Sequence, residues 1–165
     1  MTSHNIQKLL NTLPQIGTVK WIGLRPSRRS TMIEPSTVEA TTENGLVGDR
    51  YSGKSGKRHV TLIQHEHLSV IASVLGIEEC KPALLRRNIV VSNINLLALK
   101  GKKFQAGDAI LEYTGLCHPC SLMEKTFGAG GYNAVRGHGG ITAKIVKNGL
   151  IRLNDTIEFY NTNRF

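Results

Sequence analysis

The spacing of apolar and polar positions predicts many short strands and few helices. The β-branched run Arg58–Gln64 is typical of a buried strand, and the residues 17–24 and 38–42 alternate well enough for two more. Between residues 65 and 75, apolar side chains recur at every third or fourth position, and the segment stops at Gly76. This spacing predicts a helix over 65–75.

The remaining segments extend the same pattern. We expect a short amphipathic helix over 6–12, a strand over 88–91, and a turn that feeds a strand over 104–113. The Asn-Gly pair inside the segment 144–152 predicts a hairpin. Short strands separated by turn signals indicate a mostly β protein, with a closed or nearly closed β-barrel and a few peripheral helices.

The length and the cysteine content limit the class of protein. A chain of 165 residues suggests one domain, over 1–165. The chain has no run of about 18 apolar residues, so we expect no membrane span, and the amino terminus lacks a secretory pattern. Three cysteines are an odd number and too few for a disulfide scaffold, so a reducing, cytoplasmic location is expected.

The net charge narrows the choice of partner. The formal charge is +9, from 21 basic and 12 acidic residues, and it favours an anionic partner. A phosphate-bearing cofactor, a nucleic acid and an acidic protein all fit this charge. Only 5% of the residues are aromatic, so a platform for stacking nucleic-acid bases is poorly supplied.

The segment Cys117–Cys120 holds the most informative side chains. A cysteine just past a strand, near glycines and basic residues, is placed to be a thiolate, because positive charge lowers a thiol pKa. The plainer reading is a small buried apolar side chain. The CxxC spacing occurs in zinc sites, but a second ligand pair is missing. A thioredoxin-like role requires a βαβ context, whereas this chain is rich in strands.

Several basic segments could bind a phosphate. The string Gly48–Ser55 satisfies the P-loop pattern, but a β-run follows it where a P-loop needs a helix, so we interpret the match as accidental. Either Arg86 or Arg87 could bind a phosphate through two guanidinium N–H groups. The alternative is that the pair only stabilises a helix end. Arg58 opens a strand beside a glycine-rich loop, and Arg136 starts a glycine-dense segment where a ligand could approach the backbone.

In their order and spacing, eight segments resemble the MOSC domain, the module named for the carboxy-terminal part of molybdenum cofactor sulfurases. The resemblance is clearest over 45–159. The chain resembles the small stand-alone bacterial members of the family. The segments are Gly45–Arg50, Arg58–Gln64 with Glu66, Leu85–Val91, Gly107–Asp108, Pro119–Cys120, Gly139–Ala143, Lys147–Gly149 and Asn154–Asp155.

The resemblance implies a chemistry. By its motif, Cys120 corresponds to the invariant cysteine of the family, which ligates molybdenum or carries sulfur, so it is the expected catalytic residue and metal ligand. Arg58, Arg87 and Arg136, with Asn88 as a hydrogen-bonding partner, are then expected to bind the phosphate of the molybdenum cofactor (molybdopterin). The implied activity is either reduction of N-hydroxylated compounds or sulfur transfer.

The expected partners are a small-molecule substrate and a redox partner protein, with no nucleic acid and no membrane; the oligomeric state stays open. Cys117 departs from the basic motif and could compete as a ligand or form a reversible disulfide with Cys120. The alternative from another class is a basic module without catalysis, which binds nucleic acid or a protein.

Overall fold

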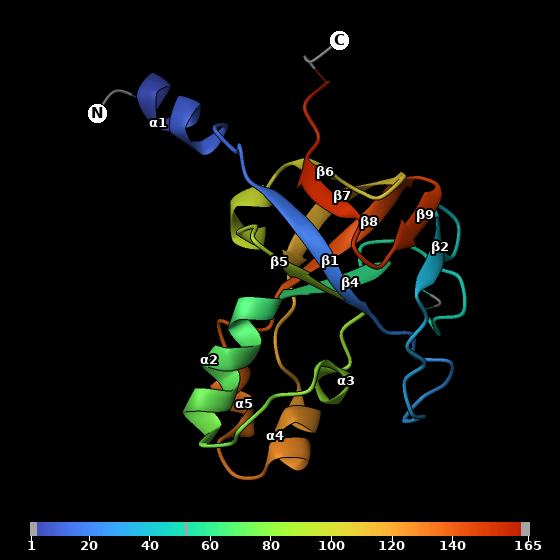
Figure 1. The fold of residues 1–165 in the computed structure, drawn as a ribbon, viewed down its shortest axis with the longest axis vertical. Coiled ribbons are helices and arrows are strands. Elements are labelled where there is room, and N and C mark those ends of the chain that lie inside the picture. The colour runs from blue at the N-terminus through green and yellow to red at the C-terminus, as the bar shows by residue number, and fades with distance from the viewer. Residues whose placement is uncertain (1–2, 52, 163–165) are drawn as a thin grey trace.

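Seven strands close into a barrel in this computed structural model, which describes residues 3–51 and 53–162 (Figure 1). The expected mostly β barrel with peripheral helices is therefore confirmed. Around the barrel the order is β1 (Ile16–Ile22), β10 (Thr156–Phe159), β6 (Lys103–Ala106), β7 (Ala109–Leu116), β8 (Ile141–Lys147), β4 (Val60–Gln64) and β5 (Ile89–Ser92).

The parallel pairing of β4 with β5 in the barrel determines where the main helices lie. Parallel neighbours need a crossover of a dozen or more residues, which usually contains a helix. Here the crossover carries α2 (His65–Leu75) and the short α3 (Pro82–Leu85). The helix predicted over 65–75 is confirmed at both ends, and Gly76 closes it in the left-handed conformation, with φ of 69°.

Strand β4 is buried along its whole length because both of its faces are covered. Val60 and Leu62 point into the barrel, and Ile63 packs in a second cluster outside it with residues of α2. Successive side chains of a strand alternate between faces, so a strand between two apolar layers reads as a continuous apolar run. This explains the uninterrupted pattern that the sequence shows here.

A second, three-stranded sheet lies beside the barrel, in the order β3 (Gly45–Leu46), β2 (Thr37–Thr41) and β9 (Gly149–Arg152). The predicted hairpin over 144–152 is wrong. Strand β8 pairs with β7 as far as Lys147, whereas it pairs with β4 only over 141–143, and beyond that the Ile145 N–H donates to His59 Nδ1 at 3.1 Å. The chain after β8 is held at the turn between β6 and β7, where the Leu150 carbonyl accepts from the Asp108 N–H at 2.9 Å, and β9 pairs with β2 instead.

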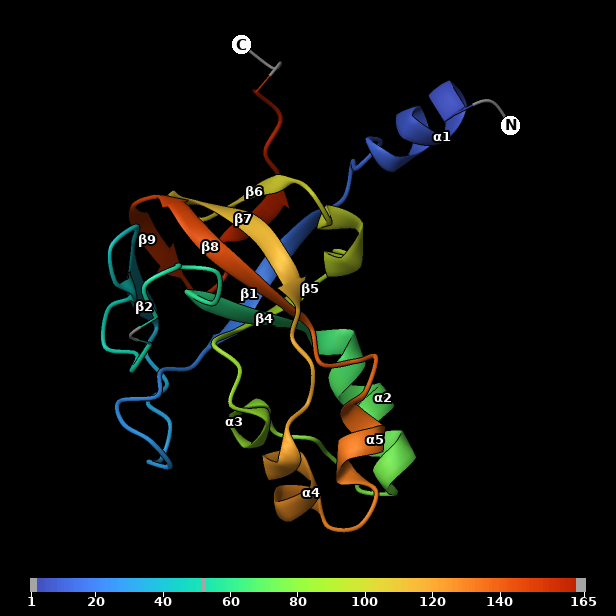
Figure 2. The same ribbon diagram turned by 180° about the vertical axis from the view of Figure 1, so that it is seen from behind.

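Two of the remaining helices pack together near α2, and another projects from the barrel. Helices α4 (Ser121–Phe127) and α5 (Gly131–Val135) pack together, α5 also contacts α2, and the short helix η1 is Leu96–Leu99. Helix α1 (Ser3–Leu10), predicted over 6–12, points away from the barrel in both views (Figures 1 and 2). In the described part of the chain, no helix has the length and apolar character that a membrane span requires.

Candidate functional site

A cavity of about 320 Å³ opens where the loop after β1 meets the loop before β4. Three arginines line it, and we call it the arginine cavity. Its lining residues are Arg25, Arg50, Tyr51, Gly53, Arg58 and Thr61. The P-loop-like string Gly48–Ser55 belongs to the loop before β4. It leads into a strand rather than a helix, which agrees with our interpretation of the match as accidental.

Asp49 holds Arg25 in place at the cavity. Its side chain is fully buried, and its two oxygens accept from the Arg25 Nε and Nη2 at 3.1 and 2.8 Å. Burial raises the pKa of Asp49, but the hydrogen bonds and the charge of Arg25 outweigh burial, so the pKa lies below its ordinary value. Asp49 is thus ionised, both of its carboxylate oxygens accept from Arg25, and its charge neutralises that arginine.

Asn88 lies beneath the cavity and joins its walls. Its amide oxygen accepts from the backbone and the hydroxyl of Thr61, both at 3.1 Å. Its amide nitrogen donates to the Gly23 carbonyl at 3.0 Å and to Asp49 at 3.2 Å. Asn88 is completely buried. The structure therefore places this predicted cofactor contact below the cavity surface, as the residue that connects β4 to the Arg25–Asp49 pair.

Arg86 adds a positive charge that has no ion-pair partner among the described residues. Its Nη1 donates to the Ser30 carbonyl at 2.7 Å, whereas its Nη2 is buried and finds no hydrogen-bond partner in that part of the chain. Burial lowers the pKa of Arg86, the charges of Arg25 and Arg50 lower it further, and Asp49 opposes them. A buried guanidinium donor beside two other arginines favours binding of an anion.

Arg58 and Arg87 meet at Cys117. The Arg58 Nη2 lies 3.9 Å from the Cys117 sulfur. Arg87 is buried and donates to the carbonyls of Leu85, Cys117 and Gly139 at 2.8, 3.3 and 2.8 Å. Its pKa is lowered by burial, while the nearby thiols of Cys117 and Cys120 act in the opposite direction. Arg87 therefore ties the segment after β7 to the barrel.

The cysteines differ sharply in exposure. Cys117 and Cys80 are buried, and Cys120 is exposed just before α4. The chain from 117 to 120 contains no turn or bend and runs as an extended connection from β7 to α4 (Figure 2). Cys117 and Cys120 are both free thiols in this structure, which does not contain the disulfide considered from the sequence.

The comparisons with known proteins agree with this architecture. The sequence model of the MOSC domain matches residues 48–158, most of the chain. The chain belongs to the MOSC domain family. The resemblance inferred from the sequence is thereby confirmed.

Several solved structures are similar to this MOSC domain in fold. The YuaD protein from Bacillus subtilis has a TM-score of 0.76 and 16% identity, over 91% of this chain and 100% of its own. YiiM from Escherichia coli has a TM-score of 0.67 and 16% identity, over 87% and 70% of the two chains. YiiM from Geobacillus stearothermophilus has a TM-score of 0.70 and 12% identity, over 90% and 77%. No curated protein matches the sequence.

The MOSC domain brings together only some of the predicted site residues. Arg58 lines the arginine cavity and Arg87 is buried next to Cys117, but the exposed Arg136 and Cys120 are not among the described lining residues. Sequence reasoning missed the role of Arg25 and Arg50. A usable signal existed, since Arg50 ends one of the segments that carry the resemblance and Arg25 opens a basic loop.

Proposed function

We propose that this MOSC domain binds the molybdenum cofactor, with the cofactor's phosphate in the arginine cavity and a cysteine thiolate facing the metal. The observation that carries the proposal is the cavity lined by Arg25, Arg50 and Arg58, close to which the buried Arg86 Nη2 has no hydrogen-bond partner in the described part of the chain. An unsatisfied buried donor of this kind costs about 1–3 kcal/mol or more when it carries a charge. A phosphate bound in the cavity would offset the repulsion that Arg25 and Arg50 exert on Arg86.

The charges at the cavity fit a phosphate monoester. Asp49 neutralises Arg25, whereas Arg50 and Arg58 line the cavity with no carboxylate among its described lining residues. Arg86 adds a third positive charge nearby. A phosphate carrying about two negative charges would be held by charge-assisted hydrogen bonds, for which the guanidinium fork is well shaped.

The protein itself offers a metal few ligands. In residues 3–51 and 53–162, no group of three or more His, Cys, Asp or Glu side chains is arranged to hold a metal ion. The metal would therefore rely on the sulfur atoms of the pterin, with one protein thiolate added. A soft thiolate is a suitable ligand for such a centre, and the exposed Cys120 is the thiol we assign to it.

When bound, the cofactor would supply two-electron redox chemistry. The residues of the chain would do the rest: Arg50 and Arg58 would bind the phosphate, and Asp49 would hold Arg25 in the binding orientation. Arg87 would position the segment that carries Cys120, since it donates to the carbonyl of Cys117. The activity we assign to this arrangement is reduction of N-hydroxylated compounds or sulfur transfer through the same thiol.

The test uses protein purified from a host that makes the cofactor. We expect molybdenum, measured by mass spectrometry, and pterin, measured by its fluorescence after oxidative release, in equal amounts. The Arg50→Gln/Arg58→Gln variant should lose at least tenfold of both, while the Lys103→Gln/Lys147→Gln variant, with the same change of net charge at exposed sites, should keep them. Equal loading of the two variants would contradict the proposal.

Two further assays separate the remaining possibilities. Reduction of an N-hydroxylated amidine with an artificial electron donor distinguishes the reductase from the sulfur-transfer protein, which would instead pass labelled sulfur to a thiol acceptor. A protein without metal or pterin that binds single-stranded DNA with steep salt dependence would be the non-catalytic basic module.

A further inference from the structure

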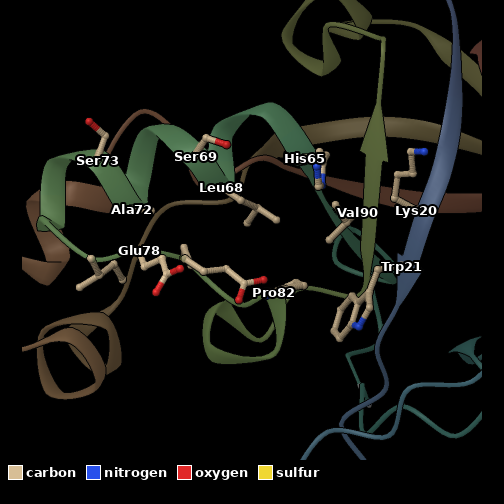
Figure 3. A pocket seen from close by; sticks show the side chains of 13 residues that line it. Lys20, Trp21, His65, Leu68, Ser69, Ala72, Ser73, Glu78, Pro82 and Val90 are labelled. Atoms are coloured by element: carbon tan, nitrogen blue, oxygen red, sulfur yellow. The ribbon is translucent and has the colours of Figure 1, made fainter.

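A second, larger cavity of about 630 Å³ lies away from the arginine cavity, and the two share no lining residue within the described chain. We call it the helix groove, because α2 forms one wall, and strands β1 and β5 and the segment 77–82 form the rest (Figure 3). Pockets for small organic ligands usually have volumes of about 300–1,000 Å³. The helix groove is therefore large enough for a whole small molecule.

The middle of the helix groove is apolar. Leu68 and Val90 are buried side chains of its floor, and the half-buried Trp21 stands at one end (Figure 3). Cys80 also lines the groove; burial, with the nearby Glu79, raises the pKa of its thiol to about 11, so it is uncharged at neutral pH. Such a surface fits a flat apolar body, and Trp21 offers a ring face for it to stack on.

The two ends of the helix groove carry opposite charges. Glu78 lies at the end near Ser73, and Lys20 lies with Trp21 at the other end (Figure 3). Glu79, next to Glu78 in the chain, lines the groove as well. Within the described residues, none of the ion pairs involves either glutamate. Both glutamates are exposed and line the groove beside its apolar floor.

We propose that the helix groove is a second ligand site, which takes a small organic cation with an apolar body. The cationic group would lie at Glu78 and Glu79, and the body would lie over Leu68 and Val90 toward Trp21. Lys20 sets the orientation, because it repels the cationic end of the ligand. An organic anion would gain from Lys20 but would meet both glutamates, so the charge pattern selects for cations.

The test compares three probes that share one body: 3-phenylpropylamine, 3-phenylpropanol and 3-phenylpropanoate. The chain has a single tryptophan, Trp21, so its fluorescence and the one indole N–H signal in an NMR spectrum report on this groove alone. At 150 mM salt we expect saturable changes with the amine and at least tenfold weaker binding of the alcohol and the carboxylate. Equal binding of all three, or tighter binding of the carboxylate, would overturn the proposal.

Two variants place the ligand within the groove. Glu78→Gln/Glu79→Gln should reduce amine affinity at least fivefold and leave the alcohol unchanged. Glu34→Gln/Glu43→Gln is the matched control, since it removes two exposed carboxylates that do not line the groove. Ser69→Phe, on an exposed turn of α2, should fill the groove and abolish binding of every probe. Amine binding that survives Ser69→Phe in a folded protein would contradict the assignment.

Discussion

At the scale of single residues, Arg86 combines two unfavourable states. Its φ of 55° lies in the left-handed region, and its Nη2 is a buried donor without a partner among the described residues. Each costs on the order of 1–3 kcal/mol. The left-handed conformation ends α3 at Arg86, whose backbone N–H donates to the Ala83 carbonyl at 3.2 Å. Arg86 does not itself line the arginine cavity, but it lies close enough for the charges of Arg25 and Arg50 to lower its pKa.

The cysteine assignment gives the first residue-scale prediction. Cys120→Ser replaces a soft sulfur with a harder, poorly ionised oxygen, so molybdenum content and turnover should fall at least tenfold while the fold survives. Cys117→Ser should keep most of both, because Cys117 is buried. The measurements are metal content and thermal unfolding of the three proteins. Full loading of the Cys120→Ser protein would disprove the assignment.

Asp49 gives the second prediction. Asp49→Ala leaves Arg25 without its partner and should reduce the free energy of unfolding by about 3 kcal/mol. Because the folded pKa of Asp49 lies below its ordinary 3.8, the pair stabilises the protein above about pH 4, and this contribution is lost as the pH falls through the folded pKa. Urea unfolding between pH 3 and pH 7 should show this acid loss in the wild type and a smaller one in the variant.

At the scale of elements, closure of the barrel depends on one close approach between chain segments. Gly140, just before β8, has φ of 87°, and a Cβ built there would overlap the Leu62 carbonyl of β4. The Gly140 carbonyl also accepts from the Cys117 N–H at 2.9 Å. One glycine therefore lets β8 pack against β4 and holds the start of the segment that carries Cys120.

We predict that Gly140→Ala destabilises the protein by more than about 3 kcal/mol. Gly137→Ala is the control, because Gly137 has a similar φ of 85°, but a Cβ added there would meet only open space. That variant should cost only the backbone strain, about 1 kcal/mol. The difference between the two unfolding free energies isolates the clash with β4. If both variants lost a similar free energy of unfolding, backbone strain alone would account for the effect.

At the scale of the whole molecule, the arginine cavity opposes stability in the absence of an anion. A net charge of +9 with several arginines at one place produces repulsion that an anion relieves. A ligand that binds only the folded state stabilises it by about 1.4 kcal/mol at ten times its Kd. Binding and folding stability are therefore linked through the same charges.

This linkage gives a prediction for the intact protein. Inorganic phosphate at constant ionic strength should raise the melting temperature of the wild type. The Arg50→Gln/Arg58→Gln variant should melt at a higher temperature than the wild type without phosphate and should respond little to it. The Lys103→Gln/Lys147→Gln variant should respond to phosphate as the wild type does. An identical phosphate response in all three proteins would contradict an anion site at the cavity.

Local patterns in the sequence determined strand β4, helix α2 and the choice of a barrel, because side-chain periodicity and turn residues act within a few positions of the chain. The motif order likewise determined the family. Tertiary structure alone decided that β9 pairs with β2, that Cys117 is buried while Cys120 is exposed, and that Arg25 and Arg50 join Arg58 while Arg136 does not. These outcomes depend on which strands have free edges and which loops meet after closure, and neither is a property of any short segment.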